Sequence, residues 1–296
     1  MTDRQCELSR RLLLTAGGMT LFSACGTVGS ESGTAKNTAT APESNPAPAS
    51  SPASSSAAPT PQPAGTPTPA APSTAPSAKP SGKTPAEPEY YVHGGPMELA
   101  LTLDDGPSPV YTPQVLAILR RHGVTATFFL IGANVEKFPD IVRQIVDDGH
   151  HLGNHTWSHP DLGTLSAGQT RDEMERTSDI IARSGRGQRP TLFRAPGGFF
   201  THASMALCGE LGLRPVSWSV DPRDWSRPGT QKIVDEVLGH ARAGSIILDH
   251  DGSLLKGTAP VPGSPEDRSQ TVAALDTYLP RLIGDGYRFT ALDPAA

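Results

Sequence analysis

Two histidines and a pair of adjacent aspartates have the residue types and spacing of a metal site. Asp104 and Asp105 are neighbours, and three residues separate His155 from His159. Such a spacing can bring two imidazoles to one side of a metal ion, although such a pair taken alone is more often not a ligand set. The histidine segment lacks the Glu that a zinc peptidase helix needs, so that class of enzyme is excluded. Taken alone, a string such as Asp104-Asp105-Gly106-Pro107 is more often an ordinary turn that ends a strand.

The rest of the chain after residue 96 alternates between strand-like and helix-like patterns. Runs of apolar residues bounded by turn residues predict strands at residues 97–103, 125–131, 151–155, 191–194, 215–220, 245–248 and 287–292. Apolar positions at helical spacing predict helices at residues 112–122, 133–148, 167–183, 205–211, 231–241 and 271–283. This alternation indicates an α/β fold with parallel strands, in a barrel or an open sheet. We predict a distorted (β/α) barrel of about seven parallel strands.

Ionisable residues follow five of the predicted strands. In barrels of parallel strands, active residues lie at the carboxyl ends of the strands. Residues without a shared function would instead be scattered among strand starts, strand ends and helix faces, so we expect one common site. Its members, in chain order, are Asp104, Asp105, His155, His159, Arg194, Asp221, Asp224 and His250.

Five short motifs also occur in the order in which they occur in a known enzyme family. They are TLDDGP at residues 102–107, HTWSH at 155–159, RAPGG at 194–198, DPRDW at 221–225 and LDH at 248–250. With these motifs the domain resembles the polysaccharide deacetylases of carbohydrate esterase family 4, which share the NodB homology domain. The resemblance extends over residues 96–292, and five ordered motifs make it highly specific.

The resemblance implies a metal-dependent hydrolase. Asp105, His155 and His159 would be the protein ligands of a divalent metal, which lowers the pKa of bound water to about 7. Two histidines and one aspartate suit zinc best, and cobalt would also fit. Asp104 would be the base that accepts a proton from the water, and His250 would be the acid that protonates the departing amine.

The resemblance also assigns roles to residues around this centre. Arg194 would orient the base, and Asp224 would support the cationic form of the catalytic histidine. The backbone N–H of Gly197 would help to stabilise the oxyanion. Trp225 and Leu248 would wall the pocket that takes the acetyl methyl group.

Two features depart from the family pattern. The family commonly has Tyr where this chain has Gly197, so we expect an aromatic wall to be lost, which leaves the choice of substrate open. A Gly/Pro-rich insertion at residues 252–266 is expected to form an extra loop at the rim of the site.

The amino-terminal part has the pattern of an export signal and a tether. Residues 1–25 carry paired arginines before a short apolar stretch, as in a twin-arginine signal, and end in FSAC. These last residues resemble a lipoprotein box in which Cys25 is lipidated. Residues 26–88 consist almost entirely of Ala, Pro, Ser, Thr and Gly, so we expect a disordered linker there and a deacetylase domain at 89–296. The domain would act outside the cytoplasm, anchored to the cell membrane as a lipoprotein or, alternatively, secreted.

The composition limits the function further. The formal net charge of the 296 residues is −5, and no run of Lys or Arg is present. The electrostatic footprint of nucleic-acid binding is therefore absent, whereas a carbohydrate substrate fits this balance. Cys208 is the single cysteine of the expected domain, which excludes a disulfide within it and suggests a small buried residue.

Three functions remain open at this point. The first is N-deacetylation of N-acetylglucosamine in peptidoglycan or in chitin-like oligomers, and the second is hydrolysis of O-acetyl esters on xylan. The third is a catalytically inactive, tethered carbohydrate-binding module. All five central residue types are present, which argues against the inactive module, and attachment to the membrane favours a substrate in the cell envelope.

Overall fold

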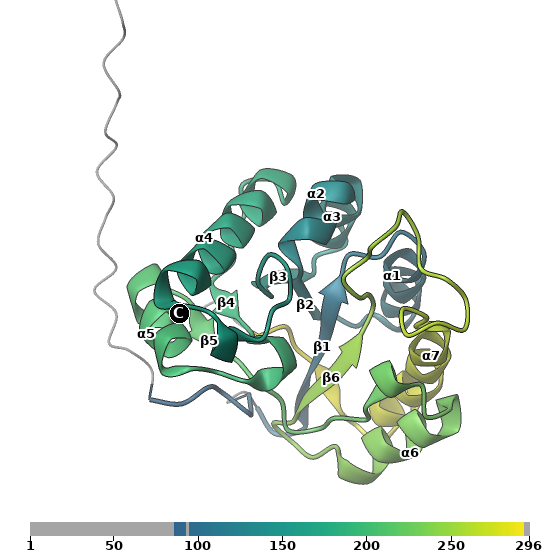
Figure 1. Ribbon diagram of the computed structural model, residues 1–296. Helices are drawn as coiled ribbons and strands as arrows, with labels where there is room; N and C mark the ends of the chain where they lie inside the picture. The colour runs from purple at the N-terminus through teal and green to yellow at the C-terminus, as the bar shows by residue number, and fades with distance from the viewer. Residues whose placement is uncertain (1–85, 93–94, 293–296) are drawn as a thin grey trace, which may run out of the picture. The chain divides into compact units, whose positions relative to one another are not determined.

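The computed structural model describes residues 86–92 and 95–292 of the chain (Figure 1). The expected export signal with Cys25, and the expected linker up to residue 85, lie outside the described residues, so the domain boundaries remain predictions. Among the residues that are described, no helix is both long enough and apolar enough to cross a membrane.

Seven strands form one parallel sheet, which confirms the predicted α/β class. Their order across the sheet is β5–β4–β3–β2–β1–β6, and β7 pairs with the start of β1. The strands are β1 (Glu98–Gly106), β2 (Thr127–Leu130), β3 (His151–Asn154), β4 (Leu192–Phe193), β5 (Arg214–Pro215), β6 (Ile246–His250) and β7 (Arg288–Phe289).

A segment before β1 bridges the gap between the two ends of this sheet. Glu89 pairs with Val216, next to β5, and Tyr91 pairs with Ser245, next to β6. These are isolated bridges rather than full strands. The sheet therefore curves into the distorted barrel that was predicted, and isolated bridges rather than a full strand close it between β5 and β6.

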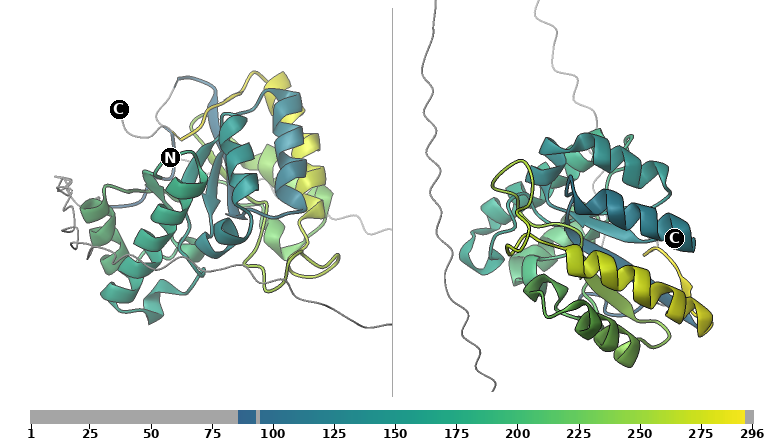
Figure 2. Two further views of the ribbon diagram at one scale, coloured as in Figure 1. Left: turned by 90° about the horizontal axis from the view of Figure 1, so that it is seen from above. Right: turned by 90° about the vertical axis from the view of Figure 1, so that its right-hand side faces the viewer.

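Helices follow most of the strands and pack around the sheet (Figure 2). Helix α7 lies beside α1 and α6, and α4 lies beside α2 and α5. The helices are α1 (Tyr111–His122), α2 (Gly132–Lys137), α3 (Pro139–Asp147), α4 (Ala167–Ser184), α5 (His202–Leu211), α6 (Thr230–His240) and α7 (Ser269–Gly284).

The single helix predicted at residues 133–148 is wrong, because the structure has two helices there. Helix α2 ends before Phe138, and α3 starts at Pro139. A proline fits the first turn of a helix, where its missing N–H is not needed, but it cannot continue a preceding helix. The apolar periodicity runs through the break and therefore did not reveal it.

Strand β1 is the buried centre of the fold. Leu99, Leu101 and Leu103 belong to the main hydrophobic core together with residues of α1 and α7. Ala100, on the other face, belongs to a second apolar cluster with Phe129 of β2. Because both faces of β1 are covered, the strand is a firm base for the residues at its carboxyl end.

Candidate active site and metal centre

The residues predicted from the strand ends come together at one pocket of about 580 Å³. Arg194 and Asp224 are buried behind this pocket and contact residues that line it. The lining includes Asp104, Asp105, His155, His159, Gly197, Asp221, Trp225, Leu248 and His250.

A bulge at the end of β1 brings two adjacent carboxylates to this pocket. The predicted strand stops before Asp104, whereas β1 runs on to Gly106, and its register against β2 shifts between these two residues. Asp105 has a φ of 70°, in the left-handed region. Consecutive side chains of a regular strand point to opposite faces. The bulge re-aims one of them, so both aspartates line the pocket.

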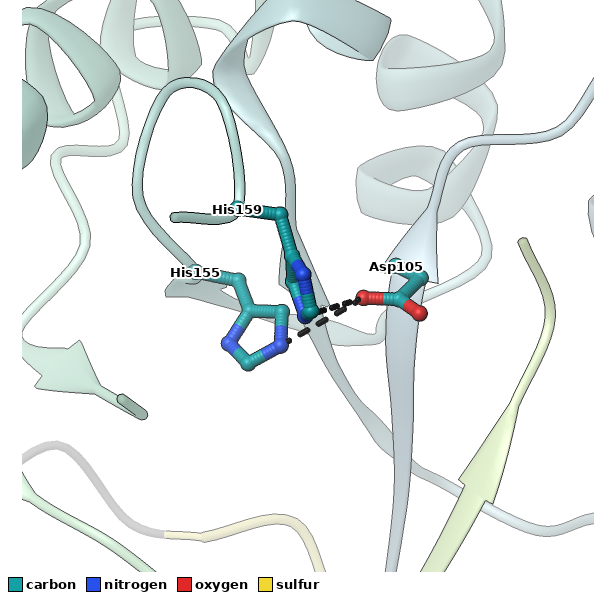
Figure 3. Close-up of side chains that lie close together, drawn as sticks. All are labelled: Asp105, His155 and His159. Atoms are coloured by element: carbon teal, nitrogen blue, oxygen red, sulfur yellow. Dashed lines mark ion pairs between the residues drawn. The ribbon is translucent and has the colours of Figure 1, made fainter. Parts of the chain in front are cut away.

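Asp105, His155 and His159 form a compact group of potential metal ligands. Figure 3 shows both imidazoles directed towards the carboxylate of Asp105. The Oδ1 atom of Asp105 lies 3.4 Å from Nε2 of His155 and 3.2 Å from Nε2 of His159. This buried oxygen has no hydrogen-bond donor, and one ligand atom of each residue lies within 4.8 Å of the others. A divalent metal ion fits this donor set and would satisfy the orphaned oxygen.

Two further features prepare these residues for a metal. The Nδ1 atom of His155 lies 2.8 Å from the carbonyl oxygen of Arg194. The ring nitrogen that donates to this carbonyl cannot bind a metal, so Nε2 is the ligand atom. Burial alone would raise the pKa of Asp105, but its close contacts with the imidazoles of His155 and His159 outweigh burial and hold the pKa far below its usual range. The carboxyl group of Asp105 is thus ionised, which is the form that binds a metal ion.

Helix α4 holds the loop that carries the two histidines. The Oε2 atom of Glu173 accepts hydrogen bonds from the backbone N–H groups of Trp157, at 2.7 Å, and Ser158, at 2.8 Å. His159 has a φ of 53°, which an ordinary residue adopts only when its surroundings hold it there. Glu173 was not among the predicted site residues, because an acidic residue on a polar helix carries no local signal of this role.

Asp104 is paired with an arginine that has no access to solvent. Arg194 is 0% exposed and donates from one guanidinium nitrogen to Oδ1 of Asp104 at 2.7 Å. Its other nitrogens donate to the carbonyl oxygens of Val216 and Ser217, and its guanidinium stacks on the ring of Phe129. These contacts also explain why the strand predicted at residues 215–220 is wrong in length. Strand β5 ends at Pro215, and the next two carbonyls accept from Arg194, so the chain continues there with isolated bridges rather than a regular strand.

His250, on the other side of the pocket, is paired with a buried aspartate. Its Nδ1 lies 2.7 Å from Oδ1 of Asp224, whose Oδ2 accepts hydrogen bonds from the His250 N–H and the Thr271 hydroxyl. Burial opposes the protonation of His250, but the charge of Asp224 outweighs it and raises the pKa of His250 to about 9. The pocket therefore contains a carboxylate held by an arginine and a histidine held by a carboxylate, together with the potential metal ligands.

Comparisons with known proteins agree with this geometry. The polysaccharide deacetylase family matches residues 93–216 of the chain. A peptidoglycan-N-acetylglucosamine deacetylase of Bacillus cereus is 42% identical over 200 residues, which cover 66% of this chain and 85% of that protein. The chain belongs to the polysaccharide deacetylase family.

Other relatives in the family carry a second name. A chitooligosaccharide deacetylase of Bradyrhizobium sp. (strain ANU 289) is 41% identical over 198 residues, covering 67% of this chain and 90% of that protein. The crystal structure of a peptidoglycan N-acetylglucosamine deacetylase superposes with a TM-score of 0.62 at 37% identity, covering 69% of this chain and 90% of that one.

The pocket of this deacetylase keeps an aromatic wall, which corrects one expectation. Phe199 lines the pocket and is 73% exposed, and Trp225, also in the lining, is 51% exposed. A Cβ atom at Gly197 would lie 3.0 Å from two atoms of the Phe199 ring. The glycine therefore leaves room for an aromatic ring that comes from two residues later in the chain.

The insertion of this deacetylase borders the site, as expected for residues 252–266. The side-chain amide of Asn134 donates both to the carbonyl oxygen of Asp105, at 2.9 Å, and to that of Ser253, at 2.8 Å. Pro265, near the other end of the insertion, lines the pocket. The insertion is thus tied to the strand that carries the metal ligand.

Proposed function

We propose that this chain is a zinc-dependent N-deacetylase that hydrolyses the acetamido group of N-acetylglucosamine residues in an envelope glycan. The observation that carries this proposal is that the pair of Asp104 with Arg194 and the pair of His250 with Asp224 lie at the same pocket as three convergent metal ligands. The names of the relatives, which are deacetylases of peptidoglycan and of chitooligosaccharides, support the substrate class.

Asp105, His155 and His159 would hold the metal. Two imidazoles and one carboxylate suit zinc, and the open side of the pocket leaves room for water and substrate. A bound divalent metal would lower the pKa of water to about 7 and polarise the acetyl carbonyl.

Asp104 is positioned to take a proton from the attacking water. Its Oδ1 is held by Arg194, which leaves Oδ2 on the side of the ligands, 3.6 Å from Nε2 of His155. The buried guanidinium fixes the carboxylate in one orientation, so the base does not have to be ordered when the substrate binds.

His250 is positioned to donate a proton to the leaving nitrogen. Its Nδ1 is held by Asp224, so Nε2 is the nitrogen that is free to donate into the pocket. With a pKa of about 9, the imidazole is protonated at neutral pH. Cleavage of the carbon–nitrogen bond then yields acetate and a protonatable amine on the sugar.

Acetate release from three substrates tests the proposal. We expect release from peptidoglycan glycan strands or chitooligosaccharides, in parallel with the appearance of free amines on the sugar. Release from acetylxylan alone, without new amines, would assign the chain to the ester hydrolases. No release from any of the three, with metal supplied, would favour the inactive binding module.

We also propose that the enzyme is a lipoprotein attached to the cell membrane through Cys25, acting outside the cytoplasm. The support is the FSAC box and the low-complexity stretch that separates it from the described domain. Fractionation of cells tests this, since Cys25→Ala should leave the membrane fraction. An unmutated protein that is entirely soluble would contradict the anchor.

A further inference from the structure

Two arginines that the proposed mechanism does not use line the same pocket as the metal ligands. Arg223 comes from the loop before the short helix η3 (Asp224–Ser226), and Arg268 is the residue before α7. Within residues 86–92 and 95–292, neither arginine forms an ion pair with a carboxylate. Both positive charges are therefore available to a ligand in the pocket.

Arg268 is the more unusual of the two, because it is a nearly buried cation without a counter-ion. It is 4% exposed, and its NH1 atom donates only to the backbone carbonyls of Pro265 and Asp267. Its Nε is buried without any partner. The carboxylate of Asp267 does not neutralise it, since that group pairs with Arg227 at 3.2 Å. A buried charge is costly unless it is paired, and an anion in the pocket would pair it.

Of the groups around these arginines, the side chain of Arg223 is the one most open to a ligand. Helix α7, which begins directly after Arg268, does not add to this anion preference, because its amino terminus is already capped: Oδ1 of Asp267 accepts the backbone N–H of Ser269 at 2.8 Å. Arg223 is exposed, and its side chain makes no hydrogen bond within the described residues. Asp221 is the acidic group at this side, but its Oδ1 accepts the backbone N–H of Arg223 at 2.8 Å and is held in that turn.

We propose that Arg268 and Arg223 form a carboxylate-binding subsite next to the catalytic pocket, and that the preferred substrate is an acidic glycan. This inference rests on the proposed function and narrows it. In the glycan strand of peptidoglycan, every second sugar carries a lactyl ether whose carboxyl group is a free carboxylate where the stem peptide has been removed, whereas chitin oligomers are neutral. A guanidinium binds a carboxylate through two parallel hydrogen bonds, which would place the neighbouring acetylated sugar over the metal ligands.

A matched pair of substrates tests the subsite. Peptide-free glycan-strand oligomers with free lactyl carboxylates are compared with the same oligomers after reduction of the carboxyl groups to alcohols. The measured quantity is the ratio of kcat/KM on the carboxylated and the reduced oligomers. We expect a ratio of about tenfold or more in the zinc-loaded wild-type protein, since a hydrogen bond to a charged group has this order of effect. The ratio should decrease as the salt concentration rises.

Three variants complete the experiment. Arg223→Gln and Arg268→Gln should each bring the ratio towards one, and Arg223→Glu should bring it below one. Arg183→Gln is the matched control, because Arg183 is an exposed arginine near the end of α4 that does not line the pocket, and its ratio should equal that of the wild type. If Arg268→Gln fails to fold, the two Arg223 variants still decide.

The possible results separate this inference from the proposed function. A wild-type ratio near one, or a ratio that survives in Arg223→Gln and in a folded Arg268→Gln, overturns the carboxylate subsite. If free acetate inhibits the wild type and Arg268→Gln relieves that inhibition without changing the ratio, the arginine binds the released product, and the inference is also wrong. Failure to deacetylate either oligomer, and chitooligosaccharides as well, would count against the proposed function itself.

Discussion

Asp104 and Asp105 are neighbours in the chain, yet their contacts assign them to different tasks. Asp104 pairs with Arg194, whereas the orphaned oxygen of Asp105 faces the two histidines. We predict that Asp104→Asn still binds metal but loses about 10²–10⁴-fold in kcat, because an amide cannot accept the proton. Asp105→Asn should instead weaken metal binding, because a neutral amide oxygen is a poorer ligand for a divalent cation.

A titration of both variants with zinc checks this assignment. Excess zinc should restore part of the activity of Asp105→Asn and almost none of that of Asp104→Asn. Recovery of Asp104→Asn to near wild-type rates would mean that the two roles are reversed. Metal content by elemental analysis serves as the control, since Asp104→Asn should retain it.

We expect the partner of His250 to set the alkaline limit of the activity. A general acid works only while it is protonated, so activity falls as the pH rises through its pKa. The charge of Asp224 raises this pKa to about 9 against the effect of burial. We predict that Asp224→Asn lowers the pKa, and that the alkaline limb of the pH profile of kcat moves to lower pH. An unchanged alkaline limb in a folded variant would show that another group controls it.

At the scale of elements, helix α4 supports the metal site without contributing a ligand. Glu173 holds the backbone between the two histidines, and His159 depends on that backbone for its left-handed conformation. We predict that Glu173→Ala lowers metal affinity by about tenfold or more, the usual effect of losing a group that orients ligands. Equilibrium titration with zinc measures it.

Glu175, on the same helix, is the matched control for this variant. It pairs with Arg171 at the surface, and within the described part of the chain it forms no hydrogen bond or ion pair with the loop. Surface ion pairs contribute about 0–1 kcal/mol, so Glu175→Ala should keep the metal affinity and almost all of the stability. Equal loss of affinity in both variants would indicate a general weakening of the helix rather than a role for Glu173.

At the scale of the whole molecule, metal binding should be linked to stability. The potential ligands come from β1 and from the loop after β3. Both strands pair with β2, so a bound metal would tie these parts of the sheet together. Zinc at 100 times its Kd should add about 2.7 kcal/mol to the free energy of unfolding. We predict a rise in Tm with zinc that chelation reverses and that His155→Ala abolishes. A Tm independent of zinc would contradict the metal site.

The sequence alone determined which strand each site residue follows. The residue types of the five motifs, and their position after successive strands, predicted the α/β class and the site, because the carboxyl ends of parallel strands meet at one edge whatever the details of packing. Helix boundaries were less predictable. The break at Pro139 and the short β5 depend on one proline and on the demands of a buried guanidinium.

Only the tertiary structure decided how the side chains face one another. Four features of the site depend on neighbours that no sequence motif identifies. They are the bulge at Asp105, the ring of Phe199 beside Gly197, the hydrogen bonds from the histidine loop to Glu173, and the unpaired charge of Arg268. Local periodicity describes which face of an element is apolar. It contains no information on which distant residue fills the space opposite, since that depends on how all the elements pack at once.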